Sequence, residues 1–140
     1  MDGKPFRLAV KAVILDAAGR CLLVRRSPVN RNFVGKWEWP GGKVDQGEDF
    51  ASAVLREVTE ETGLQIEITG LAGAMAFEMP AVHVVVLSME ARVTGGDIRL
   101  SEEHDAFVWV PLAELARRDL TEHVRKFMVD YATRKGTPHA

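Results

Sequence analysis

Stretches of aliphatic residues in the first half of the chain and again near its end predict a core rich in β-strands. Residues 8–16 and 21–25 are dense in Val, Ile, Leu and Ala, and the turn signal Ala-Ala-Gly-Arg separates them. We therefore expect two strands joined as a hairpin. Further strands are expected at residues 65–69, 71–77, 82–93 and 106–110.

Helical patterns lie between and after these strands. Acidic residues at 48–49 favour a helix start, and Gly63 suits the left-handed conformation that follows a helix's last turn. Pro111 is expected to start a short helix, and apolar residues at helical spacing predict an amphipathic helix over residues 122–133. Residues 135–140 are expected to be frayed. This order of elements predicts an α/β fold, a sandwich with a mixed sheet.

Residues 27–47 follow neither a strand nor a helix period and contain two Pro and four Gly. We interpret them as one long loop. Loops of about twenty residues are uncommon inside compact domains and usually serve function.

Composition excludes several classes of protein. The 140 residues predict a single domain spanning residues 1–140. Lys+Arg 18 against Asp+Glu 20 gives a net charge of −2, which argues against a nucleic-acid partner. No apolar run reaches the ~20 residues of a membrane helix and the start lacks a signal peptide, so a cytoplasmic protein without a membrane partner is expected. Cys21 lies beside two Leu and is expected to be buried.

Three carboxylates share one side of the predicted central helix. Glu57, Glu60 and Glu61 stand at relative spacings i, i+3 and i+4, where like charges destabilise a helix. They also lie near the helix C-terminus, where the dipole disfavours anions, and Arg56 is the one nearby cation. A solvated acidic face is one interpretation. The other is a metal site, because a bound divalent cation would relieve the repulsion.

The chemistry of such a site favours a hard cation. Mg²⁺ prefers carboxylate oxygens and shares substrate phosphates, with Mn²⁺ as the second candidate, and we find no Cys or His at the ligand spacing of zinc sites. Upstream, Gly41 and Gly42 let the backbone approach a ligand closely. A loop and a helix would then converge on one metal cluster.

The spacing of these residues resembles the Nudix box. Gly42, five residues, Glu48, seven residues and then Arg-Glu-Val-Thr-Glu-Glu-Thr-Gly-Leu fill all nine defining positions over residues 42–64. The lead-in at residues 37–42 and the strand at 107–110 also resemble small MutT-like members of the Nudix hydrolase family. The resemblance implies an α/β/α sandwich around a mixed β-sheet and a hydrolase that cleaves a nucleoside diphosphate linked to another moiety.

The resemblance also implies roles for individual residues. Glu48 would pair with Arg56 and orient the helix against the loop. The implied Mg²⁺ ligands are the carbonyl of Gly41 and the carboxylates of Glu57, Glu60, Glu61 and, from the loop before the last strand, Glu103. Glu102 is the alternative in that loop. Glu57, Glu61 and Glu103 all remain candidates for the base that takes a proton from the attacking water.

Four further residues are candidate substrate contacts. By resemblance, Arg26 is the phosphate or sugar contact, against the alternative of a solvated basic residue. Lys43 follows the glycines and is a second candidate cation. Trp37 and Trp39 have faces that can stack on a nucleobase, although packing in the core is the more frequent role for at least one of them.

The expected substrate is a small nucleotide. The length favours a MutT-like nucleoside triphosphatase that releases a monophosphate and pyrophosphate. The alternative is an ADP-ribose or nucleotide-sugar pyrophosphatase, and a non-catalytic nucleotide-binding domain is the third possibility. The segment after Trp109 offers no Asn where MutT itself contacts the oxidised base, which argues against a preference for 8-oxo-dGTP. Either a monomer or a homodimer fits the sequence.

Overall fold

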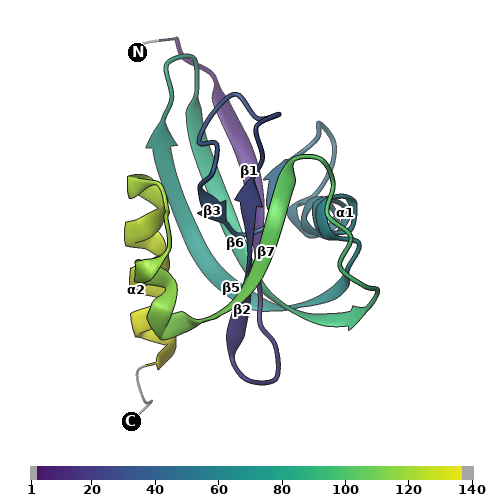
Figure 1. The fold of residues 1–140 in the computed structure, drawn as a ribbon. Helices are drawn as coiled ribbons and strands as arrows, with labels where there is room; N and C mark the ends of the chain where they lie inside the picture. Colours follow the sequence, from purple (N-terminus) through teal and green to yellow (C-terminus); the bar gives the residue numbers. More distant parts are fainter. Residues whose placement is uncertain (1–2, 137–140) are drawn as a thin grey trace.

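The computed structural model describes residues 3–136 and consists of a layer of strands between two helices (Figure 1). The strands are β1 (Phe6–Ile14), β2 (Arg20–Arg26), β3 (Trp37–Glu38), β4 (Gly41–Lys43), β5 (Gln65–Glu78), β6 (His83–Gly95) and β7 (His104–Pro111). They form a four-stranded sheet of order β4-β1-β6-β5 and a three-stranded sheet of order β3-β2-β7. β1 and β6 are parallel while the other neighbours are antiparallel, so the predicted mixed sheet is confirmed.

The helices begin and end close to the predicted positions. The helices are α1 (Phe50–Thr62), the short 3-10 helix η1 (Leu112–Arg117) and α2 (Glu122–Gly136). The Asp49 side chain accepts a hydrogen bond of 2.7 Å from the Ser52 N–H, and Gly63 ends α1 with φ 75°. α2 extends through Lys135 and Gly136, the first two residues of the segment that the sequence predicted to be frayed. Residues 137–140 lie outside the described part of the chain.

The expected hairpin between the first two strands is wrong. β1 and β2 belong to different sheets, and the chain passes between them through an isolated bridge of Leu15 with Cys21 and a hydrogen bond from the Asp16 N–H to the Arg20 carbonyl. The reason is that the last residues of β1 and the central residues of β2 are buried on both faces. Val10 of β1 packs in the core beneath α1, whereas Val13 of the same strand packs in the core beneath α2. A flat hairpin would leave one of these faces in water.

The structure also differs from the sequence prediction in the extent of one strand and in the content of the long loop. The strands predicted at 65–69 and 71–77 are one strand, β5, because register shifts beside Gly70 and Gly73 let it bend without ending. The long loop predicted over residues 27–47 contains β3 and β4, which are too short to show a period in the sequence.

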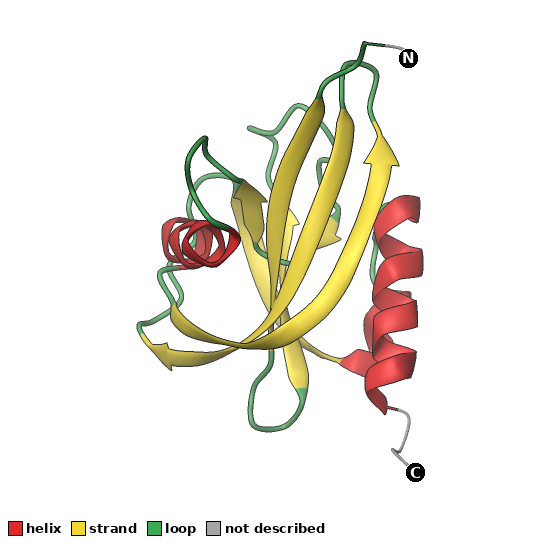
Figure 2. Ribbon diagram, turned by 180° about the vertical axis from the view of Figure 1, so that it is seen from behind, coloured by secondary structure: helices red, strands yellow, loops and turns green. Residues whose placement is uncertain are grey.

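Two clusters of buried hydrophobic residues hold the layers together. One lies between α1 and the strands, and the other, which includes Cys21 and Trp39, lies under α2. Figure 2 shows the curved strands between the helices, with α1 seen almost end-on and α2 seen lengthwise. Among residues 3–136, none of the helices has the length and hydrophobicity needed to cross a membrane.

Candidate metal and substrate site

The last two turns of α1 place Glu61 and Glu57 against Gly41 and Gly42, which we call the glycine corner. Glu61 is 4% exposed, and its carboxylate accepts a hydrogen bond of 2.7 Å from the Gly41 N–H. Gly41 has φ 146°, and a Cβ there would lie 2.0 Å from the Val10 carbonyl oxygen of β1. A Cβ on Gly42 would lie 2.6 Å from the Glu57 carboxylate. Gly41 therefore requires glycine, because backbone atoms of β1 leave no room for a Cβ, whereas a Cβ at Gly42 would push the Glu57 carboxylate aside.

Arg56 organises the solvent side of this helix. Its guanidinium donates two hydrogen bonds to Glu48, at 2.8 and 2.9 Å, and further ones to Glu57 at 3.0 Å and Glu60 at 3.2 Å. The expected Glu48–Arg56 pair is thus present, and its hydrogen bonds lower the pKa of Glu48 to about 2. Arg56 also partly offsets the repulsion between carboxylates that the sequence indicated. The Glu60 side chain is 59% exposed.

Burial makes Glu61 different from its neighbours. Burial raises its pKa to about 8, although the charge of Lys11 and the Gly41 N–H act in the opposite direction. Burial also raises the pKa of Glu57, while Arg56 opposes the shift. A carboxyl group that is costly to ionise in isolation favours a cation beside it.

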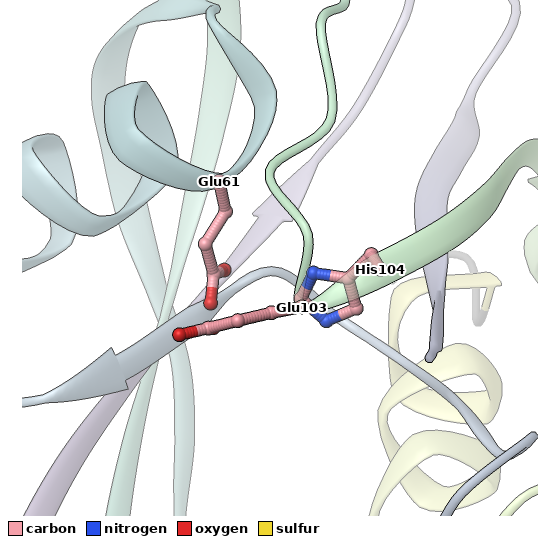
Figure 3. A group of neighbouring side chains, drawn as sticks. All are labelled: Glu61, Glu103 and His104. Atoms are coloured by element: carbon pink, nitrogen blue, oxygen red, sulfur yellow. The ribbon is translucent and has the colours of Figure 1, made fainter. Parts of the chain in front are cut away.

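Glu103 reaches the same place from the other sheet. The Ser27 N–H and the Asn30 side-chain amide both donate to its backbone carbonyl, at 2.9 and 2.8 Å. Glu61, Glu103 and His104 each offer one ligand atom within 4.8 Å of the others, and Figure 3 shows the two carboxylates converging from α1 and from the start of β7. Glu102 is not part of this group among the described residues. We call Glu57, Glu61 and Glu103 the carboxylate cluster.

A buried charge network that the sequence did not indicate lies beside the carboxylate cluster. Glu38 contacts His104 Nε2 at 2.8 Å, Arg26 Nη1 at 3.2 Å and Lys11 Nζ at 3.5 Å. Burial opposes its ionisation, but Lys11, His104 and Arg26 together hold the pKa of Glu38 at about 2. Lys11 Nζ also lies 3.5 Å from the Gly41 carbonyl oxygen. This network therefore places fixed positive charge at the edge of the carboxylates.

Next to this network is a cavity of about 230 Å³ between β1, β5, β6 and the start of α2. The ring of Phe77 stacks on His123 at 3.9 Å with an angle of 19° between the planes, and Phe33 contacts the same imidazole edge-on. Burial lowers the pKa of His123 and so favours its neutral form. Lys11 and Arg26 line the cavity as well, so it opens toward the buried charge network.

The candidate substrate contacts occupy different environments. Arg26 lines the cavity, hydrogen-bonded to Glu38 and to Asn30. Trp39 also borders the cavity but is 3% exposed, with Phe127 and Tyr131 of α2 packed against it edge-on. This packing corrects the stacking role expected for Trp39, because the indole is built into the core.

The other two candidates lie closer to solvent. The guanidinium groups of Arg25 and Arg118 lie 5.7 and 5.6 Å from the Trp37 ring centroid, a cation–π arrangement at the cavity's border. Lys43 is exposed on β4, and its carbonyl accepts a hydrogen bond from Arg56. The ammonium that the fold brings to the carboxylates is that of Lys11.

Known proteins share this fold and sequence pattern. The family model described as the NUDIX domain matches residues 5–131. A MutT-like protein of Streptomyces ambofaciens is 32% identical over 111 residues, which cover 79% of this chain and 68% of the relative. An 8-oxo-dGTP diphosphatase of Proteus vulgaris is 33% identical over 86 residues, covering 61% and 75%. The crystal structure of a MutT protein from Methanosarcina mazei Go1 matches with a TM-score of 0.88 at 33% identity, over 98% of this chain and 100% of that one.

Proposed function

We propose that this chain, which belongs to the Nudix hydrolase family, cleaves nucleoside triphosphates to a nucleoside monophosphate and pyrophosphate with the help of Mg²⁺. The match of the family model over residues 5–131 shows the membership. The observation that carries the proposed substrate class is an aromatic cavity of about 230 Å³ beside the carboxylate cluster, with Lys11 and Arg26 between them. A nucleoside would occupy the cavity, and its phosphates would extend toward the carboxylates.

The donors fit a hard divalent cation. Glu57, Glu61 and Glu103 offer carboxylate oxygens, and the burial of Glu61 makes an uncompensated negative charge there costly. We assign the cation to these three, with Glu60 at the exposed edge and the Gly41 carbonyl as a further oxygen. When bound, Mg²⁺ supplies charge neutralisation on the phosphate oxygens and acidifies water.

The side chains around the cation would bind the base and the phosphates and accept the proton of the attacking water. The stacked pair of Phe77 and His123 would present one outer aromatic face to the base, since every nucleobase has a π-face. Lys11 and Arg26 would hold the phosphate or sugar that joins the base to the reacting phosphates. A cluster carboxylate would accept the proton of the attacking water, and Glu57, Glu61 and Glu103 remain the candidates. Arg56 would keep Glu57 in place through its hydrogen bond.

The size of the cavity favours a substrate with one nucleoside. A volume of about 230 Å³ is below the ~300 Å³ at which pockets for drug-sized ligands begin, so it suits one base rather than a base and a second sugar. A pyrophosphate product also needs no second apolar pocket. The Proteus vulgaris relative is named for a triphosphate substrate, which agrees with this choice.

The test is a substrate panel with product identification. Purified protein with Mg²⁺ is incubated with canonical and oxidised nucleoside triphosphates, nucleotide sugars, ADP-ribose and dinucleotides, and the products are separated by anion-exchange chromatography. We expect pyrophosphate and monophosphate from at least one triphosphate. Cleavage of ADP-ribose alone would replace the proposed substrate class with the alternative, and no turnover on any compound would favour a binding domain.

A further inference from the structure

One nitrogen next to the carboxylate cluster has no role in the hydrogen bonding of the fold. Among the described residues, Nδ1 of His104 and Nε1 of Trp39 are the buried side-chain atoms without a hydrogen-bond partner. Trp39 packs against the aromatic rings of α2. His104 is 4% exposed and lies at the start of β7, directly after Glu103. A buried polar atom without a partner costs free energy, so its presence calls for an explanation.

The partner of the other ring nitrogen decides which tautomer the neutral imidazole adopts. Nε2 lies 2.8 Å from the Glu38 carboxylate, which also accepts a hydrogen bond from Arg26 and pairs with Lys11, and a carboxylate so paired accepts hydrogen bonds and does not donate. Nε2 must therefore carry the proton. In the neutral ring Nδ1 is then left with a free lone pair. Metal-binding histidines commonly have this arrangement, in which a carboxylate fixes the outer N–H and the inner nitrogen binds the ion.

The position of the ring agrees with this chemistry. A ring nitrogen of His104 lies within 4.8 Å of carboxylate oxygens of Glu61 and Glu103, and Figure 3 shows the imidazole beside both side chains. Ligands about 2.1 Å from one ion lie up to ~4.2 Å apart. The exposed side chain of Glu103 can supply the small adjustment.

We infer that His104 Nδ1 is a ligand of the divalent cation held by Glu61 and Glu103. This inference rests on the proposed function and adds one nitrogen to an all-oxygen donor set. Imidazole binds transition metals better than it binds Mg²⁺, so this position favours Mn²⁺ over Mg²⁺. Glu38 is then a positioning residue, because it fixes the protonation and the orientation of the ring.

The experiment uses Mn²⁺ as the probe. Binding is titrated by electron paramagnetic resonance, and electron spin-echo envelope modulation detects nitrogen nuclei coupled to the bound ion. His104→Gln keeps an amide that can donate to Glu38 but removes the δ nitrogen. His83→Gln is the matched control, because His83 contacts Phe6 and Glu78 at the other end of the sheet. Wild-type protein labelled with ¹⁵N-histidine makes the test independent of whether a variant folds.

We expect nitrogen coupling in the wild type, a changed coupling pattern after ¹⁵N labelling, and loss of the coupling in His104→Gln but not in His83→Gln. Mn²⁺ affinity should fall about 10-fold or more in His104→Gln, and Mg²⁺ affinity should fall less. Bound Mn²⁺ without nitrogen coupling in the wild type would overturn the ligand assignment and leave the proposed function standing. Absence of both Mn²⁺ binding and Mg²⁺-dependent turnover would instead overturn the proposed function.

Discussion

The solvent side and the sheet side of the carboxylate cluster give carboxyl groups very different surroundings. On the solvent side, Arg56 hydrogen-bonds to Glu48, Glu57 and Glu60, and the Glu60 side chain remains 59% exposed. On the sheet side, Glu61 is 4% exposed, without a guanidinium partner among the described residues, and burial raises its pKa to about 8. Adjacent residues of one helix thus hold very different carboxyl groups. The buried one is the group that needs a cation.

The largest effect should come from Glu61→Gln compared with Glu60→Gln. In Glu61→Gln the new side-chain amide keeps an oxygen for the Gly41 N–H but loses the charge, so we expect Mg²⁺-dependent turnover to fall by ~10² or more. Glu60 is mostly exposed and paired with Arg56, so its substitution should cost only a few-fold. Both rates are measured on the same triphosphate, with folding checked by circular dichroism. Similar losses in the two variants would remove the distinction between the two sides.

The metal-free protein should lose stability as pH rises. The folded pKa of Glu61 is about 8 and its ordinary value is 4.5, so the folded state holds more protons between these values and stability falls from pH 5 to pH 8. We expect a loss of about 2–4 kcal/mol from this group. Urea unfolding of wild type and Glu61→Gln in EDTA measures it. Comparing the two removes the contributions of other groups, such as His123.

In the same measurement, Glu61→Gln should be the more stable protein at pH 8 and nearly equal to the wild type at pH 5. Added Mg²⁺ should stabilise the wild type and have a much smaller effect on the variant. If the difference in unfolding free energy between the wild type and Glu61→Gln is the same at pH 5 and at pH 8, the burial argument is contradicted.

The site residues that could be predicted from the sequence lie close together along the chain. The box acids and Gly41 and Gly42 could be singled out because they lie within 23 residues and follow helical or loop spacing, and the resemblance to the Nudix box implied the Glu48–Arg56 pair. Lys11, Glu38 and His104 were missed because they come from three strands that meet only through the sheets. The register that aligns Val24 with Glu38 and Arg26 with His104 brings Glu38 and His104 together, and Lys11 comes from the other sheet, where it pairs with Gly41.

The same limit applies to the fold. The ends of α1 were predictable because Asp49 and Gly63 act locally. The partition of β1 and β2 between two sheets was not, because it depends on which helix covers each face. Which of the two tryptophans packs in the core was not predictable for a related reason, since nothing local indicates that α2 packs on the ring of Trp39.

Phe77→Ala separates substrate binding from metal binding. Loss of the ring that stacks on His123 should raise KM for a triphosphate about 10-fold, because base stacking contributes ~1–3 kcal/mol. Mn²⁺ affinity should not change, since the ring lies in the cavity rather than among the carboxylates. Steady-state kinetics and a metal titration on one preparation give both values. An unchanged KM would mean that the base binds elsewhere.

Lys11→Met should have a smaller effect on KM. Lys11 lies between the cavity and the carboxylate cluster. We expect KM to rise several-fold because a charge-assisted contact is lost, with Lys11→Arg recovering part of it. Lys126→Met on the exposed face of α2 is the matched control. Unaltered kinetics in Lys11→Met would mean that the Lys11 ammonium serves the buried network around Glu38 and does not contact the substrate.

The most direct test of the central claim is a ³¹P NMR time course of the wild-type protein with a nucleoside triphosphate and Mg²⁺. We predict that the three triphosphate resonances are replaced by those of a monophosphate and pyrophosphate in equal amounts, and that EDTA stops the change. Formation of a nucleoside diphosphate and orthophosphate, or conversion that continues in EDTA, would contradict the proposed reaction.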